Sequence, residues 1–266
     1  MTYKRRRKRR PSAPVRKTDR RWRVPPPLVH GPEPLEGGTI LEELREPISV
    51  VLWQAARDIS LWASTAEEQR GELFSQDATK NRRAAISSLD ARPAVTGPLA
   101  EVSAILAGSA DEARLAKACE SIARWAETES LPGVALAFGQ AVALIRDEDP
   151  RVAYEVGVRA RNREEDARAE TWFRRAVMLS RQNGDWTTYS QSFLALGDLY
   201  IDRGGFGVAK KFLVRASRAA KRHSLHAIEE EALAGLATVE KESAVADGQE
   251  SSPKVSRRGR SARARE

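Results

Sequence analysis

The sequence predicts an all-α protein in which antiparallel helix pairs stack into a short superhelix, with a disordered basic tail at each end. Three observations lead to this fold class. Between the tails, nearly every segment carries apolar residues at three- and four-residue spacing, while alternating runs long enough for strands are missing. The C-terminal half repeats itself at a fixed offset, which is typical of stacked helical units. Both ends lack periodic apolar residues.

Residues 1–38 form the first predicted tail, a basic and proline-rich arm. Its first 24 residues hold twelve lysines and arginines against Asp19 alone, a net charge of +11. Residues 244–266 form the second tail, in which Gly, Ser and Arg dominate and residues 250–266 carry a net +4. Neither segment has enough apolar surface to offset the entropy of ordering, so both are expected to be disordered.

The net charge of +8 therefore does not describe the predicted folded region. Once the tails are subtracted, residues 25–249 carry a net charge of about −7. An unbroken basic run in the arm predicts salt-dependent, sequence-independent contact with nucleic acid through phosphate neutralisation. The run consists of Lys4, Arg5, Arg6, Arg7, Lys8, Arg9 and Arg10. Alternatively, the arm folds back on the acidic body. Contact with a membrane is less favoured, because the arm lacks an amphipathic apolar face.

Residues 39–107 are predicted to be an N-terminal helical region, which either extends the solenoid or forms a separate bundle. An apolar stripe covers residues 40–63, and Pro47 within it either begins a new helix or kinks one. A second helix is expected over residues 66–89, because Ser64 and Thr65 precede two glutamates. Pro93, Gly97 and Pro98 then predict a linker, followed by a short helix over residues 99–106.

Residues 108–243 contain the repeat, which appears when the sequence is compared with itself at an offset of 40. Gly157 then falls on Gly197, and Phe173 falls on Leu213. Each unit is a helix pair: residues 151–161 with 166–182, and residues 188–202 with 208–223. A small residue in the first helix lets the two backbones approach closely. A single pair leaves an apolar face open, so stacking of the pairs is required.

At these residues the segment resembles the tetratricopeptide repeat (TPR) family. The family pattern asks for a bulky residue, Leu, Gly, Tyr, Ala, Phe and Ala at fixed steps, and the second unit supplies Phe193, Leu196, Gly197, Tyr200, Ala209, Leu213 and Ala216. The period of 40 exceeds the family's usual 34 residues, and extra loop or helix length around residues 183–186 is the expected reason. Residues 112–126 with 134–145 look like a degenerate preceding unit, and residues 225–239 look like a capping helix. The resemblance covers residues 111–240 and implies a right-handed superhelix.

The resemblance also implies a function, which is binding of a peptide or helix of another protein in a groove lined by the first helix of each pair. The implied groove residues are Arg151, Tyr154, Val158, Arg161, Gln191, Leu194, Asp198 and Ile201. Family members that clamp a chaperone's C-terminal carboxylate use Lys and Asn where this chain has Tyr154, Val158, Leu194 and Asp198. A chaperone tail is therefore not the expected ligand.

No constellation for catalysis stands out, so we expect neither an enzyme nor a cofactor. The lone cysteine, Cys119, lacks a histidine partner and is expected to be a buried hydrophobe. His223 and His226 have permissible ligand spacing, but they fall in a predicted polar turn, so no metal site is expected. The glycines from Gly204 to Gly207 resemble a phosphate loop only weakly, because no strand precedes them, and a tight turn between helices explains them equally.

The remaining expectation concerns location and assembly. The chain has neither a membrane-spanning apolar stretch nor an apolar signal core after its basic N-terminus. A cytoplasmic protein is predicted, and a single cysteine agrees with a reducing compartment. Self-association through the open ends of the solenoid is a further expectation, since a short stack exposes its terminal pairs.

Overall fold

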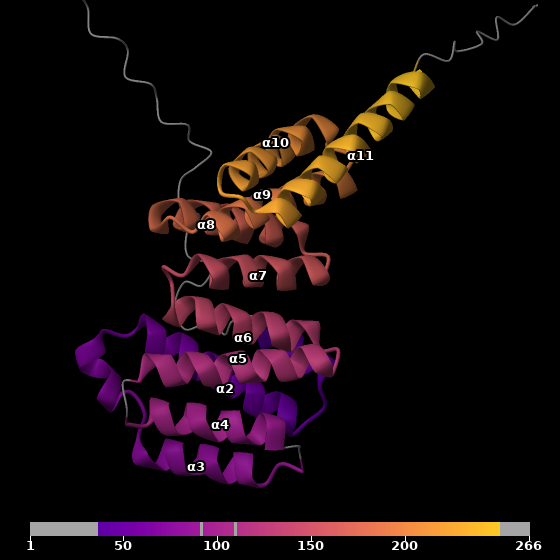
Figure 1. Cartoon of the computed structure of the whole chain (residues 1–266). Coiled ribbons are helices and arrows are strands. Elements are labelled where there is room, and N and C mark those ends of the chain that lie inside the picture. Colours follow the sequence, from indigo (N-terminus) through magenta and orange to yellow (C-terminus); the bar gives the residue numbers. More distant parts are fainter. Residues whose placement is uncertain (1–36, 91–92, 109–110, 251–266) are drawn as a thin grey trace, which may run out of the picture.

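The computed structural model describes residues 37–90, 93–108 and 111–250, with side chains over 40–90, 93–108 and 111–244. These residues are helical throughout, joined by short turns, and contain no strand. Successive helices pack as adjacent antiparallel pairs in a stack (Figure 1), which confirms the predicted fold class. The basic run from Lys4 to Arg10 and the tail beyond Glu250 lie outside the described residues. None of the described helices has both the length and the apolar character needed to cross a bilayer.

The repeat region forms three helix pairs and a final helix. The pairs are α5 (Glu112–Thr128) with α6 (Pro132–Ile145), α7 (Pro150–Asn162) with α8 (Asp166–Asn183), and α9 (Trp186–Asp202) with α10 (Phe206–Arg222). The final helix, α11 (His226–Glu250), packs on α10 and α9 and extends past them (Figure 1). It ends seven residues beyond residue 243, where we predicted that the folded domain stops.

The three pairs share one turn geometry, which shows the repeat in the backbone. Ser130, Glu164 and Gly204 each adopt a positive φ of about 60° to 70°. The residue after each one donates a backbone hydrogen bond to a carbonyl five residues earlier, at N–O distances of 2.7 to 3.0 Å. This is the 6→1 hydrogen bond of a Schellman motif, which ends a helix and satisfies carbonyl groups that have no partner in its last turn. The matched positions lie 34 and then 40 residues apart.

Gly157 and Gly197 allow the helices of their pairs to approach closely. A β-carbon on Gly157 would lie 2.6 Å from ring carbons of Phe173, and one on Gly197 would lie 2.5 Å from Cδ2 of Leu213. Both glycines and both large partners are buried. The predicted role of these glycines is confirmed, because any other residue would overlap its neighbour.

The extra length of the 40-residue period lies in the helices rather than in the loops. The connections before and after α9 span only residues 184–185 and 203–205. Helix α8 has 18 residues, and α9 has 17 residues against 13 in α7. The longer loop around residues 183–186, which was one of the two expected explanations, is therefore wrong, and added helical turns account for the period.

The N-terminal helices are α1 (Gly37–Glu43), α2 (Ile48–Ser64), the 3-10 helix η2 (Glu67–Glu72), α3 (Gln76–Ser87) and α4 (Pro93–Leu106). Pro47 separates α1 from α2, so a new helix begins there rather than a kink. Two predictions were wrong. Residues 66–89 form two elements, because Ser75 caps α3 by accepting a hydrogen bond from the backbone N–H of Ala78. Residues 93–98 belong to α4, which contains Pro98 in its interior.

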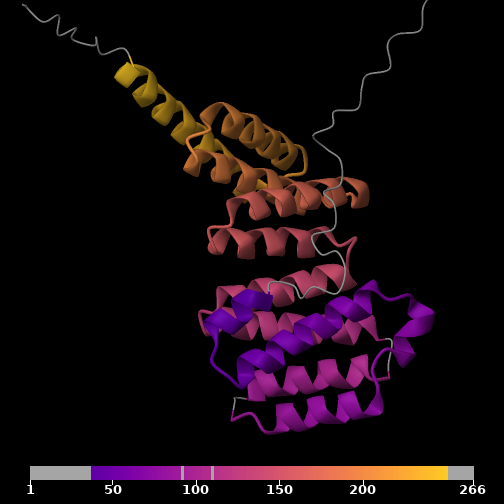
Figure 2. The same cartoon turned by 180° about the vertical axis from the view of Figure 1, so that it is seen from behind.

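Helices α1 and α2 join the N-terminal region to the repeat. Figure 2 shows α2 lying across the stack of α4, α5 and α6, where it packs on α4 and α6. The Glu43 carboxylate accepts hydrogen bonds from the backbone N–H groups of Gly133 and Val134, at 2.6 and 3.0 Å, and so caps α6. Arg163, between α7 and α8, donates to the same carboxylate at 3.1 Å. One buried cluster runs from Ile40 to Ala232, so residues 39–107 share a core with the repeat.

Candidate partner-binding face

The first helices of successive pairs expose one common surface, which contains most of the predicted groove residues. Tyr154, Val158 and Arg161 repeat at four- and three-residue steps on α7, and Leu194, Asp198 and Ile201 do so on α9, so each set lies on one side of its helix. All six side chains are partly buried. We call this surface the partner-binding face, made of Tyr154, Val158, Arg161, Leu194, Asp198, Ile201, Asp202 and Glu231.

Ion pairs and charges show that residues from three helices meet on this face. The Arg161 guanidinium lies 2.6 Å from an Asp202 carboxylate oxygen and 4.0 Å from one of Asp198, which joins α7 to α9. Glu231 on α11 is close enough to influence both Tyr154 and Asp198 electrostatically. The face therefore carries three carboxylates against one guanidinium.

Burial and like charge act together at the centre of the face. Burial raises the pKa of the Asp198 carboxyl; Arg161 opposes this rise, while the charges of Asp202 and Glu231 add to it. Burial also raises the pKa of the Tyr154 hydroxyl, and the carboxylates of Asp198 and Glu231 raise it further. A positively charged group brought to this face would relieve the repulsion among the carboxylates.

The apolar part of the face is provided by side chains that the core supports. Tyr154, Val158 and Leu194 pack against the main buried cluster, and the Tyr154 ring lies 5.7 Å from the ring of Phe173. Leu194 and Ile201 also pack against the smaller cluster of Ala209, Leu213 and Val239. Because rigid helices hold these side chains, the face is preorganised for contact with another surface.

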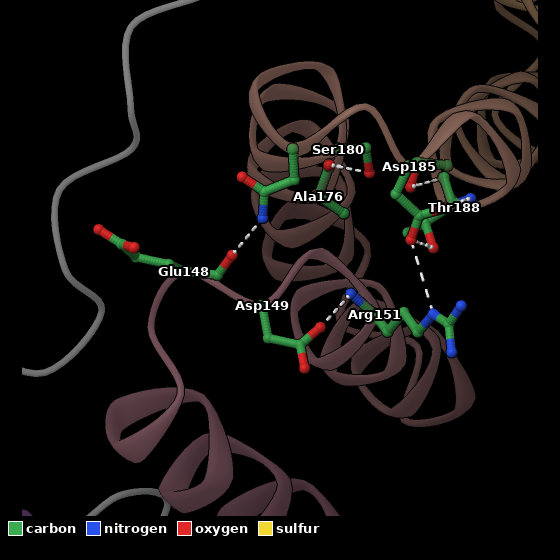
Figure 3. Close-up of polar contacts among 9 residues, drawn as sticks. Glu148, Asp149, Arg151, Ala176, Ser180, Asp185 and Thr188 are labelled. Carbon is green, nitrogen blue, oxygen red and sulfur yellow. Dashed lines mark hydrogen bonds and ion pairs between the residues drawn. The ribbon is translucent and has the colours of Figure 1, made fainter.

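Two further predicted groove residues, Arg151 and Gln191, lie three residues before Tyr154 and Leu194, toward the N-terminal ends of α7 and α9. Arg151 is exposed at the start of α7, where its Nε lies 3.6 Å from a carboxylate oxygen of Asp185 (Figure 3). Asp185 also caps α9 by accepting hydrogen bonds from the backbone N–H and the hydroxyl of Thr188. These contacts hold the pKa of the Asp185 carboxyl below its usual range, although burial opposes them. Gln191 is half-buried on α9, and no contact places it with the central group.

Two residues of the face were not predicted from the sequence. Asp202 lies four residues after Asp198, a spacing that places both carboxylates on one side of α9. Glu231 lies on α11, which was expected only to cap the stack. Its contribution depends on how α11 crosses α9 and α10, which helical spacing within α11 does not determine.

The groups considered for chemistry have structural roles. Cys119 is fully buried, and burial raises the pKa of its thiol far above the usual range, so the reactive thiolate is suppressed. His223 stacks on Trp186, with ring centroids 4.7 Å apart, while His226 is exposed at the start of α11. Gly204 and Gly205 form the turn between α9 and α10, as predicted, and the N–H of Gly205 bonds to the Tyr200 carbonyl at 2.7 Å.

A hollow surface lies on the other side of α9. It is a cavity of about 520 Å³ between α8, α9 and α10. Tyr189 and Phe193 line it, and at 100° per residue they project from α9 away from Leu194 and Asp198. Met178 contributes from α8. These residues provide a comparison surface for testing the partner-binding face.

Comparisons with known proteins identified no relative of the chain. Searches of protein-family models, of curated proteins and of solved structures each found no match to the chain.

Proposed function

We propose that the chain is a non-catalytic scaffold whose repeat domain resembles tetratricopeptide repeats, and that the partner-binding face takes up a peptide or helix of another protein. The observation that carries the proposal is the convergence of α7, α9 and α11. Half-buried apolar side chains on α7 and α9 share the face with Arg161, Asp198 and Glu231, so the face offers both apolar contact and charge. Such a combination suits a partner with an apolar anchor and basic residues beside it.

Replacing Tyr154 and Leu194 together with alanine is expected to weaken capture of the partner at least tenfold, since central aromatic and aliphatic contacts dominate most interfaces. Affinity capture with the full chain as bait, with bound proteins quantified by mass spectrometry, measures this. The matched control replaces Tyr189 and Met178, which line the cavity on the other side of α9. Equal loss of a bound protein with both double variants, or no loss with either, would count against this face. Circular dichroism checks that the helices remain folded.

A second candidate function rests on the segregation of charge along the sequence. Twelve basic residues lie within the first 24, whereas residues 25–249 are acidic overall. We propose that this arm, which includes Lys4 to Arg10, gives the chain a second activity as a nucleic-acid-associated protein.

Deleting residues 1–36 is expected to abolish binding to duplex DNA or RNA. With the arm present, affinity should fall steeply between low and physiological salt, because bound counterions are released when lysine and arginine neutralise phosphates. Fluorescence anisotropy at two salt concentrations measures both effects. Equal affinity of the full and shortened chains would remove the arm from this role.

A further inference from the structure

Helix α11 packs one side on the stack and exposes alanine and leucine side chains on the other. Ala232 and Val239 are buried against the stack. On the other side, Leu233 is 50% exposed, and Ala234 and Ala237 are exposed. These exposed residues show that no other element of the described part of the chain covers the outer side of α11.

The outer side of α11 has the spacing of a coiled-coil seam. Its exposed residues follow one another at alternating steps of three and four, the heptad spacing with which two helices pack side by side. The seam consists of Ala227, Glu230, Ala234, Ala237, Lys241 and Ala244. Leu233 lies next to this seam and widens its apolar area.

The seam is complementary to a second copy of itself running in the opposite direction. When two α11 helices are aligned antiparallel about a centre between residues 235 and 236, Glu230 faces Lys241 of the other copy at both ends. Ala234 faces Ala237 in the middle, and Ala227 faces Ala244 beyond the charges. Within the described residues, neither Glu230 nor Lys241 has an ion-pair partner, and both are exposed. Alanine in the middle lets the helix axes approach to about 8 Å.

We infer that α11 is a dimerisation helix, which pairs antiparallel with α11 of a second copy through this seam. The arrangement has two-fold symmetry, in which each residue meets its counterpart twice, as in most homodimers. Figure 1 shows α11 extending past α10, away from the rest of the stack, so a second copy can approach it. Glu231, the residue that α11 contributes to the partner-binding face, is not part of the seam.

The pairing of Glu230 with Lys241 of the other copy provides the test. Reversing the charge of Glu230 creates repulsion at both ends of the seam, and reversing that of Lys241 as well restores attraction. Sedimentation equilibrium of the nuclease-treated full chain, from low micromolar to several hundred micromolar, is expected to show a weak monomer–dimer equilibrium. Glu230→Lys should raise the dimer dissociation constant about tenfold or more. The double variant Glu230→Lys with Lys241→Glu should return it to within about twofold of the original value.

A matched control carries the same charge change elsewhere on the helix. Glu242 is exposed and lies off the seam, so Glu242→Lys should leave the dissociation constant within about threefold of the original. Ala237→Glu, at the centre of the seam, should leave only monomer, with the helix content unchanged. A full chain that is monomeric at every concentration would overturn the proposal. So would a double charge reversal that dimerises no better than Glu230→Lys alone, and neither result bears on the partner-binding face.

Discussion

Substituting valine for Gly197 is expected to destabilise the protein by about 3 kcal/mol, because overpacking a tight helix contact forces both helices apart. The first carbon of the new side chain would lie 2.5 Å from Leu213, which is fully buried and lies within the smaller buried cluster. Gly235 of α11 lies on the other side of this leucine, where even a β-carbon would be only 3.1 Å from Leu213 Cδ2, so Leu213 has little freedom to move away. The midpoint of urea unfolding, followed by circular dichroism, measures the loss.

Gly207 provides the matched control for this prediction. It also lies in a helix of the same pair, but a β-carbon there would meet nothing within 4 Å. Valine at Gly207 is expected to change the free energy of unfolding by no more than about 0.5 kcal/mol. If both valine variants lose a similar free energy of unfolding, helix propensity rather than contact with Leu213 explains the loss at position 197.

Replacing Glu43 with alanine is expected to cost about 3 kcal/mol, since it removes three charge-assisted hydrogen bonds at once. Two of them cap the first turn of α6, and the third joins the carboxylate to Arg163. The side chains of Glu43 and Arg163 are less than one-fifth exposed, so water replaces these bonds poorly. Thermal unfolding gives the loss of stability, and hydrogen exchange at Gly133 and Val134 shows whether the cap has opened.

Glu42 is the neighbouring control, because it is exposed and has the same charge. Alanine at Glu42 is expected to alter stability by about 0.5 kcal/mol or less. If the Glu43 variant matches it, and the amides of Gly133 and Val134 keep their protection, α1 does not cap α6 in solution.

The sequence was most informative where a local signal and a packing requirement coincide. Gly197 and Gly204 illustrate this: the first is demanded by contact between helices, and the second by a positive φ at the turn. The heptad spacing of α11 was equally present in the sequence. The spacing could be interpreted only with the structure, which shows which side of α11 is buried and which is exposed.

Other elements were not predictable from local signals. Pro98 predicted a linker, yet it lies inside α4, where Val95, Leu99 and Val102 are buried and the packing of this apolar side outweighs the missing N–H. The cap on α6 depends on a glutamate 90 residues earlier in the chain. Glu43 and Gly133 are too far apart in the chain for a local sequence pattern to include both.

The candidate face was predicted in part for the same reason. All eight groove residues implied by the resemblance follow one another at three- and four-residue steps, which fixes the side of each helix, and six of them form the central group of the face. Arg151 instead pairs with Asp185. Glu231 joins the face through the crossing of α11, which depends on tertiary packing.

A double-mutant cycle between Gly197 and Leu213 tests most directly whether contact between a glycine and a large side chain holds the two helices of a pair together. Gly197→Ala and Leu213→Ala are each expected to destabilise the protein, by about 2 and about 3 kcal/mol. The double variant should be more stable than the sum of these losses by about 1 kcal/mol or more, because the added methyl group enters the space that Leu213 vacates. Losses that add to within about 0.3 kcal/mol would contradict the contact and, with it, the close packing of the two helices within a pair.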